Sequence, residues 1–236
     1  MDRSRAAVAL ALGLATVSLL LGLLQIGMAR KSQDFTAPAG ALFNAGKAGI
    51  ALIEVRGVIE DGSGGPGGQG ADRIVERIRS AQEDPAVRGM LLSINSPGGT
   101  TGATKKIYDK LIEFRKEKPI VCYVTDIAAS GGYLMACVAD RIIAAPFAIL
   151  GSIGVIAQLP NFNRLLKKHD IDYEQFMAGE YKRTVTLFGE NTDKGRHKFQ
   201  EEIEATHALF KDFVKTHRPR LDLDQVAAGE YWYGTW

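Results

Sequence analysis

The segment Asp126-Ile-Ala-Ala-Ser-Gly-Gly-Tyr133 places one serine, Ser130, between two alanines and two glycines, directly after an apolar run at residues 120–124. Glycine permits backbone angles that other residues disfavour, so a strand ending in this way can turn sharply into a helix. Such a turn leaves the serine hydroxyl at the sheet edge beside backbone N–H groups, as a nucleophile requires. The alternative is an ordinary strand-to-helix turn in which Ser130 is a helix N-cap.

A second glycine loop precedes the first. The segment Ser93-Ile-Asn-Ser-Pro-Gly-Gly99 follows a strand-like run at residues 89–92 and precedes two threonines suited to capping a helix. Proline fixes one backbone angle, and the two glycines can aim peptide N–H groups at one point, which is what an oxyanion hole needs. Alone this loop would be a plain turn, but together with the serine loop it predicts half of an acyl-transfer site.

Two further polar residues are candidates for the chemistry. Ser152 lies between glycines in an otherwise apolar segment, and Lys182 ends the run Ala178-Gly-Glu-Tyr-Lys182. A lysine amine can act as a general base where its surroundings favour the neutral form, and a Ser-Lys pair is a known variant of the Ser-His-Asp arrangement. The alternative is a solvated lysine, because Glu180 and Arg183 flank it.

The pattern of the chain predicts layers of helix on sheet. Strand signals occur at residues 50–58, 89–94, 120–124, 141–145 and 154–158, and helical patterns at 71–81, 104–116, 130–138, 161–168 and about 193–216. Alternating strands and helices indicate an α/β fold with a mostly parallel sheet. The glycine-rich residues 62–70 predict a loop without a packed element. We expect Cys122 and Cys137 to be two buried thiols rather than a disulfide.

The amino terminus predicts a membrane anchor. A short basic leader precedes residues 6–29, which are 24 residues without a charge. At about 1.5 Å per residue this run can cross a hydrocarbon core of roughly 30 Å, and it is longer than a cleaved signal requires. We therefore divide the chain into leader and transmembrane anchor (1–31), tether (32–47) and one domain (48–236). The aromatic end at residues 227–236 suggests that this domain is truncated.

Composition excludes several classes of function. The net charge is +2 without clusters of lysine or arginine, so nothing indicates nucleic-acid binding. The two cysteines and four histidines show no spacing typical of metal ligands, and we expect neither a metal nor another cofactor.

The ordered motifs resemble the bacterial signal peptide peptidase A family, most closely its SohB-type members. The resemblance covers roughly residue 50 to the carboxy terminus. It rests on five segments in register: Ile94-Asn-Ser-Pro-Gly-Gly99, Ala128-Ala-Ser-Gly-Gly-Tyr133, Leu150-Gly-Ser-Ile-Gly-Val155, Pro160-Asn-Phe-Asn163 and Gly179-Glu-Tyr-Lys182. Each segment alone is a weak signal, whereas five in order are specific.

The resemblance implies a role for each site residue. Ser130 resembles the family's nucleophile, Lys182 its general base, and Ser152 the serine that orients the lysine. The amide of Gly99 resembles an oxyanion donor, to which we add an amide near Gly131. The implied activity is that of a serine endopeptidase acting on remnant signal peptides or other membrane-associated peptides.

The resemblance also implies a fold, an assembly and a location. The fold would be ClpP/crotonase-like, built from stacked ββα units and preceded by one transmembrane helix. Because this chain carries one set of motifs, as short relatives do, the resemblance implies a homo-oligomeric ring, such as an octamer, whose sites are shared between neighbours. The alternative is a monomer in which the serine and the lysine meet within one chain. The location would be the bacterial inner membrane, with the catalytic domain on the periplasmic side.

Two alternatives remain open at this stage. A crotonase-type acyl-CoA enzyme shares the superfold and its oxyanion loops, but needs neither a serine–lysine pair nor an anchor. A catalytically silent membrane scaffold of the same fold is the other. Labelling by a fluorophosphonate separates these alternatives from a serine peptidase.

Overall fold

The computed structural model describes residues 48–64 and 68–235, and the predicted anchor and tether lie outside them. The strands are β1 (Gly49–Arg56), β2 (Val58–Glu60), β3 (Gly68–Gly70), β4 (Val87–Ser96), β5 (Ile120–Ala129), β6 (Arg141–Ala144), β7 (Ile149–Gly151) and β8 (Tyr231–Tyr233). The helices are α2 (Ala71–Glu83), α3 (Thr101–Glu117), α4 (Gly131–Val138), α5 (Asn163–Lys168), α6 (Asp193–His217) and α7 (Leu223–Val226). Within the described residues, no helix combines the length and the apolar character needed to cross a membrane.

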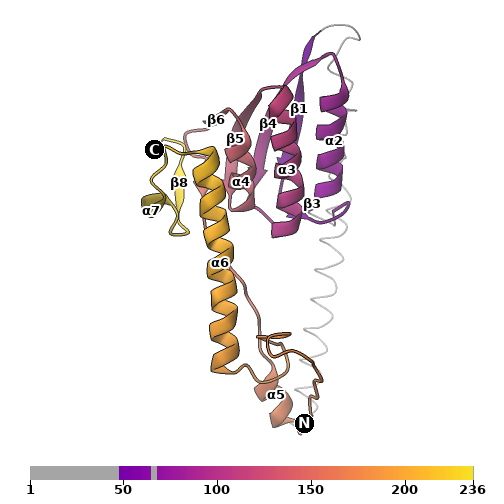
Figure 1. Ribbon diagram of the computed structural model, residues 1–236, viewed down its shortest axis with the longest axis vertical. Coiled ribbons are helices and arrows are strands. Elements are labelled where there is room, and N and C mark those ends of the chain that lie inside the picture. The colour runs from indigo at the N-terminus through magenta and orange to yellow at the C-terminus, as the bar shows by residue number, and fades with distance from the viewer. Residues whose placement is uncertain (1–47, 65–67, 236) are drawn as a thin grey trace, which may run out of the picture.

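The main sheet has the order β1-β4-β5-β7-β8, and β6 pairs with the first part of β5 (Figure 1). All of its pairs are parallel except β7 with β8, which is antiparallel. This confirms the expected α/β class with a mostly parallel sheet. The finer ClpP/crotonase-like assignment stays a prediction.

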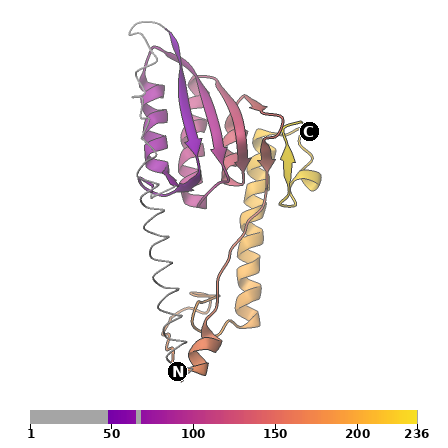
Figure 2. The same cartoon turned by 180° about the vertical axis from the view of Figure 1, so that it is seen from behind.

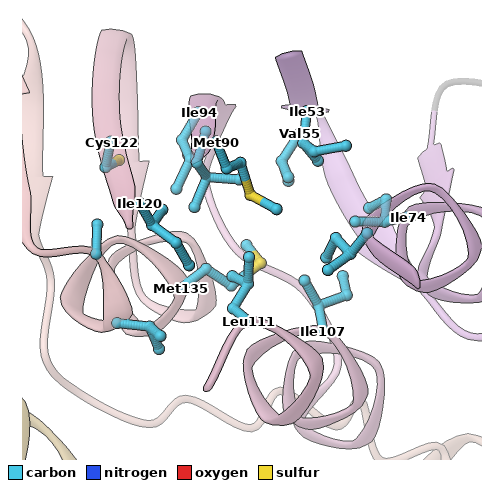
Figure 3. Packing of buried hydrophobic residues seen from close by; sticks show 14 of the residues in the cluster. Ile53, Val55, Ile74, Met90, Ile94, Ile107, Leu111, Ile120, Cys122 and Met135 are labelled. Carbon is cyan, nitrogen blue, oxygen red and sulfur yellow. The ribbon is translucent and has the colours of Figure 1, made fainter. Parts of the chain in front are cut away.

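The core lies between one face of this sheet and the helices α2, α3 and α4 (Figures 1 and 2). Alternate side chains of β4, such as Met90, Leu92 and Ile94, are buried, as expected for a strand with one covered face. Ile107 and Leu111 lie one helical turn apart on α3 and meet them (Figure 3). Burial of each such side chain stabilises the fold by about 1.5–3 kcal/mol. The ends of β4 and β5 therefore rest on a rigid support.

Both cysteines are free and buried, as the sequence predicted. Burial raises the pKa of the thiols of Cys122 and Cys137 to about 12. A protonated, buried thiol is a poor nucleophile, so neither cysteine is an alternative to Ser130 as the candidate nucleophile.

An arm, defined here as residues 154–192, leaves the layered domain after β7, carries α5 at its far end, and returns through the long helix α6 (Figures 1 and 2). Its apolar side chains are unusually open to solvent: Ile156 is 79% exposed and Phe176 is 90% exposed. Few contacts within the chain cover this surface, although the ring of Phe188 contacts those of Phe162 and Tyr173.

Three details differ from the sequence prediction. The strand predicted at residues 154–158 is wrong, because the strand β7 lies earlier and ends where Ser152 adopts a positive φ of 48°. The glycine-rich residues 62–70 are not wholly without packed structure, because Gly68–Gly70 forms β3 and pairs with β2. The short elements α7 and β8 near the carboxy terminus were not expected.

Candidate active site

Ser130 occupies the junction between β5 and α4 in an unusual backbone conformation, with φ 51° and ψ −121°. These angles lie outside the regions that a residue with a Cβ atom prefers, and such strain costs about 1–3 kcal/mol. The surrounding structure holds the strain: Ser130 N–H donates to the Gly151 carbonyl (2.9 Å), and the Ser130 carbonyl accepts from Tyr133 N–H (2.9 Å). A strained junction kept in this way is typical of a site that presents a side chain for chemistry.

Ser130 occupies the N-cap position of α4, but it does not cap the helix with its side chain. Its hydroxyl makes no capping hydrogen bond to α4, and its backbone is not in the extended region that N-cap residues adopt. Thr100, which precedes α3, shows the ordinary arrangement: its backbone is extended and its hydroxyl accepts from Ala103 N–H at 3.4 Å. The Ser130 hydroxyl is thus not consumed by the helix that follows it.

The proline-glycine loop packs directly against the serine turn. Gly98 has a φ of 105°, and a Cβ atom at this position would lie 2.8 Å from the Gly131 nitrogen and 3.1 Å from the Ser130 Cβ. A larger residue would therefore push the two loops apart. The structure thus brings together two segments that are about 30 residues apart in the chain, as the sequence predicted.

Gly99 is fixed by a short stretch of strand pairing with Ile59. Ile59 N–H donates to the Gly98 carbonyl (2.9 Å), and Thr100 N–H donates to the Ile59 carbonyl (3.1 Å). These bonds use the groups on both sides of Gly99 but not its own N–H. The N–H of Gly131 belongs to the first turn of α4, where no intrahelical acceptor exists. Within the described residues, neither of the two amides expected to be oxyanion donors therefore donates to one of these neighbouring backbone carbonyls.

The two glycines after Ser130 are explained by close neighbours that the sequence did not reveal. A Cβ atom at Gly131 would lie 2.5 Å from the Thr104 hydroxyl oxygen, and one at Gly132 would lie 2.6 Å from the Ser96 carbonyl oxygen. Thr104 is buried on α3 and its hydroxyl has no hydrogen-bond partner in the described residues. No local sequence signal could show that Thr104 contacts this turn, because Thr104 lies 27 residues before Gly131 in the chain.

This packing predicts a compensating pair of substitutions. Gly131→Ala should lower the unfolding free energy by about 1–3 kcal/mol, because overpacking forces a buried neighbour to move. Thr104→Ala removes the atom that the new methyl group meets, and it leaves no acceptor unsatisfied. The double variant should therefore melt at a higher temperature than Gly131→Ala alone. Melting curves of the three variants test this, and strictly additive losses would contradict the contact.

Ser152 lies beside the serine turn, immediately after the residue whose carbonyl holds Ser130 N–H. Its N–H donates to the Glu230 carbonyl (2.6 Å), and its φ of 48° turns the chain away from the sheet into the arm. The side chain is partly exposed. Ser152 is thus near Ser130, at the point where the arm begins.

Lys182 is exposed and lies in the part of the arm between α5 and α6. The helix α5 lies at the end of the arm away from the sheet (Figures 1 and 2). The residue before Lys182, Tyr181, lies beneath the amine of Lys198, which is 5.6 Å from the ring centroid. Phe210 lies 12 residues after Lys198 on α6, so the two residues are about 18 Å apart at 1.5 Å per residue. Phe210 is in the same buried cluster as Tyr133. The four-carbon stem of a lysine cannot span such a distance to the turn before Tyr133. Within one chain, the structure does not bring Lys182 to Ser130.

Comparison with known proteins identifies the family of the chain. The sequence model of peptidase family S49 matches residues 112–236, which include Ser130, Ser152 and Lys182. The chain belongs to peptidase family S49. The similarity to SohB-type members that the motifs indicated is confirmed by curated relatives of that name.

One relative is named "Probable protease SohB" in Haemophilus influenzae; it is 53% identical over 146 residues, which cover 61% of this chain and 41% of the relative. Another, "Putative protease SohB" of Buchnera aphidicola subsp. Baizongia pistaciae, is 45% identical over 190 residues, covering 80% and 50%. "Protease 4" of Haemophilus influenzae is 32% identical over 189 residues, covering 79% and 31%. The chain spans about half the length of the SohB relatives or less.

Proposed function

We propose that the chain is a membrane-anchored serine endopeptidase that hydrolyses peptide bonds through Ser130 and Lys182. The observation that carries the proposal is the strained Ser130 turn, whose hydroxyl caps no helix and whose neighbouring amides, at Gly99 and Gly131, are outside the local backbone pairing. The S49 family and relatives named as proteases support the same reaction class.

In the proposed reaction the Lys182 amine takes the proton of Ser130 as the hydroxyl oxygen attacks the peptide carbonyl carbon. The N–H groups of Gly99 and Gly131 donate to the carbonyl oxygen as it gains negative charge, and Ser152 orients the lysine. The lysine returns the proton to the leaving amine, which breaks the peptide bond and leaves an ester on Ser130. Water, deprotonated by the same lysine, then attacks the ester carbon. The bond to the Ser130 oxygen breaks, the lysine returns the proton to that oxygen, and the acid is released.

The lysine of each site is proposed to come from a neighbouring copy of the chain. The separation along α6 places Lys182 too far from Ser130 in its own chain, and the arm that carries it exposes many large apolar side chains. Apolar surface that is exposed in one copy of a chain is often covered where copies associate. A homo-oligomeric ring, in which each arm lies against the next copy, would cover this surface and complete each site.

The location and the substrates form the rest of the proposal. The uncharged residues 6–29 would anchor the chain in the bacterial inner membrane, with the catalytic domain on the periplasmic side. Substrates would then be remnant signal peptides or other extended peptides close to the membrane. No metal or other cofactor has a role in the proposed reaction.

Labelling by a fluorophosphonate tests the proposed function. The probe phosphonylates a serine that is activated as a nucleophile, so peptide mapping should find the adduct on Ser130 and no adduct in the Ser130→Ala variant. A crotonase-type acyl-CoA enzyme or a silent scaffold of the same fold should not react. An unlabelled wild-type chain that is folded and assembled would overturn the proposal.

A further inference from the structure

The pairing of β4 with β5 is interrupted just before the two loops of the site. The register passes from Ile94 opposite Val124 to Ser96 opposite Ala128, so β4 advances by two residues while β5 advances by four. A bulge of this kind bends one strand and changes where the following side chains point. Here the residues that follow are those of the Ser130 turn.

A pair of side chains bridges the interruption. The Asn95 amide nitrogen Nδ2 donates to the Asp126 carboxylate oxygen Oδ2 at 2.6 Å. Hydrogen bonds to a carboxylate are shorter and stronger than those between neutral groups. Asn95 lies four residues before Gly99, and Asp126 lies four residues before Ser130. The bridge therefore joins the two strands at equal distances along the chain from the oxyanion loop and from the nucleophile.

Both strands are held independently on their outer sides. On the side of β1, the Asn95 carbonyl accepts from Gly57 N–H (2.9 Å), and the Ser96 hydroxyl donates to the Gly57 carbonyl (2.7 Å). On the other side, Ile127 and Ala128 pair with β7. The bulge thus separates two firmly paired parts of the sheet, and the Asn95–Asp126 bond crosses it between them.

We propose that Asn95 and Asp126 are a positioning pair that sets the separation between the Gly99 N–H and the Ser130 hydroxyl. The pair acts through the backbone of the two strands and not by contact with the reacting atoms. This inference rests on the proposed function, because it assigns the pair a part in that reaction. A misplacement of about 1 Å in a reacting group can reduce a rate by about 100-fold, so even a small relaxation of the bulge should be measurable.

Steady-state hydrolysis by variants of the full chain tests the proposal. Asp126→Ala and Asn95→Ala should each lower kcat by about 10- to 100-fold with little change in KM. The two together should be no worse than either alone. Asp126→Asn keeps an oxygen acceptor for the Asn95 amide, so it should stay within about threefold of the wild type. Asp109→Asn, which removes a charge from an exposed carboxylate bonded to Lys105, is the matched control and should be silent.

Exchange of the two side chains is the most specific part of the experiment. Asn95→Asp alone places two carboxylates together and should be poorly active, whereas Asn95→Asp with Asp126→Asn restores a donor and an acceptor and should recover most of kcat. Three results would overturn the proposal. The folded variants could have a lower melting temperature but an unchanged kcat, only KM could change, or the exchanged pair could show no recovery. If the wild type is not labelled at Ser130 by fluorophosphonate, the proposed function itself fails; if Ser130 is labelled equally fast in wild type and Asp126→Ala, only this inference fails.

Discussion

Replacement of Ser130 by alanine is expected to lower kcat for peptide hydrolysis by at least about 1000-fold, because the attacking oxygen is lost while the oxyanion donors remain. The fold should persist, since the hydroxyl makes no capping bond and alanine can take the same place in the turn. The measurement is turnover of a peptide substrate by the purified variant, together with its melting temperature.

Two further variants make this test specific. Ser130→Gly should be equally inactive but more stable than Ser130→Ala by about 1 kcal/mol, because glycine relieves the strain at φ 51°. Ser80→Ala, which removes a hydroxyl bonded to the Glu76 carbonyl on α2, should keep full activity. Turnover above a few per cent of wild type in the folded Ser130→Ala chain would remove Ser130 from the mechanism.

Replacement of Lys182 by alanine is expected to reduce activity about as completely as loss of Ser130, because the members of one catalytic unit are not additive. Combining the two substitutions should therefore cost little more than either alone. The structure gives no reason for a loss of stability, since Lys182 is exposed.

His169 supplies the matched control for the base. It is an exposed residue at the end of α5 on the same arm, so His169→Ala should leave turnover nearly unchanged. Full activity in Lys182→Ala combined with inactivity in His169→Ala would replace the proposed serine–lysine pair with a serine–histidine system. Turnover and melting temperature of the two single variants distinguish these outcomes.

The sequence predicted the layered part of the fold well, because local signals determine it. The alternation of buried residues in β4 and the helical spacing in α3 are each visible within a few turns of chain. The meeting of the Gly98 loop with the Ser130 turn was also predictable, since both follow strands of one parallel sheet and such strands end at the same edge.

Other features depend on contacts across the chain and could not be predicted. The buried Thr104 explains why residue 131 is glycine, and the pairing of Ile59 with Gly99 explains how a nominal loop is held. The strand predicted at residues 154–158 was wrong because its apolar residues, including the exposed Ile156, belong to the arm and pair with no strand. An apolar run does not by itself say whether it will be covered by its own chain.

Subunit exchange tests whether the lysine of each site comes from a neighbouring copy of the chain. Ser130→Ala chains and Lys182→Ala chains, each inactive alone, are mixed under conditions that permit exchange between oligomers. Exchange is followed separately by native mass spectrometry of isotopically distinct chains. Each preparation incubated alone under the same conditions is the control.

Shared sites predict recovered activity, because some neighbours then pair an intact serine with an intact lysine. With equal and random mixing the recovery should approach about a quarter of the wild-type rate, since each site draws its two residues independently from the two kinds of chain. A mixture that exchanges subunits fully and stays inactive would show that the serine and the lysine of a site do not come from different copies.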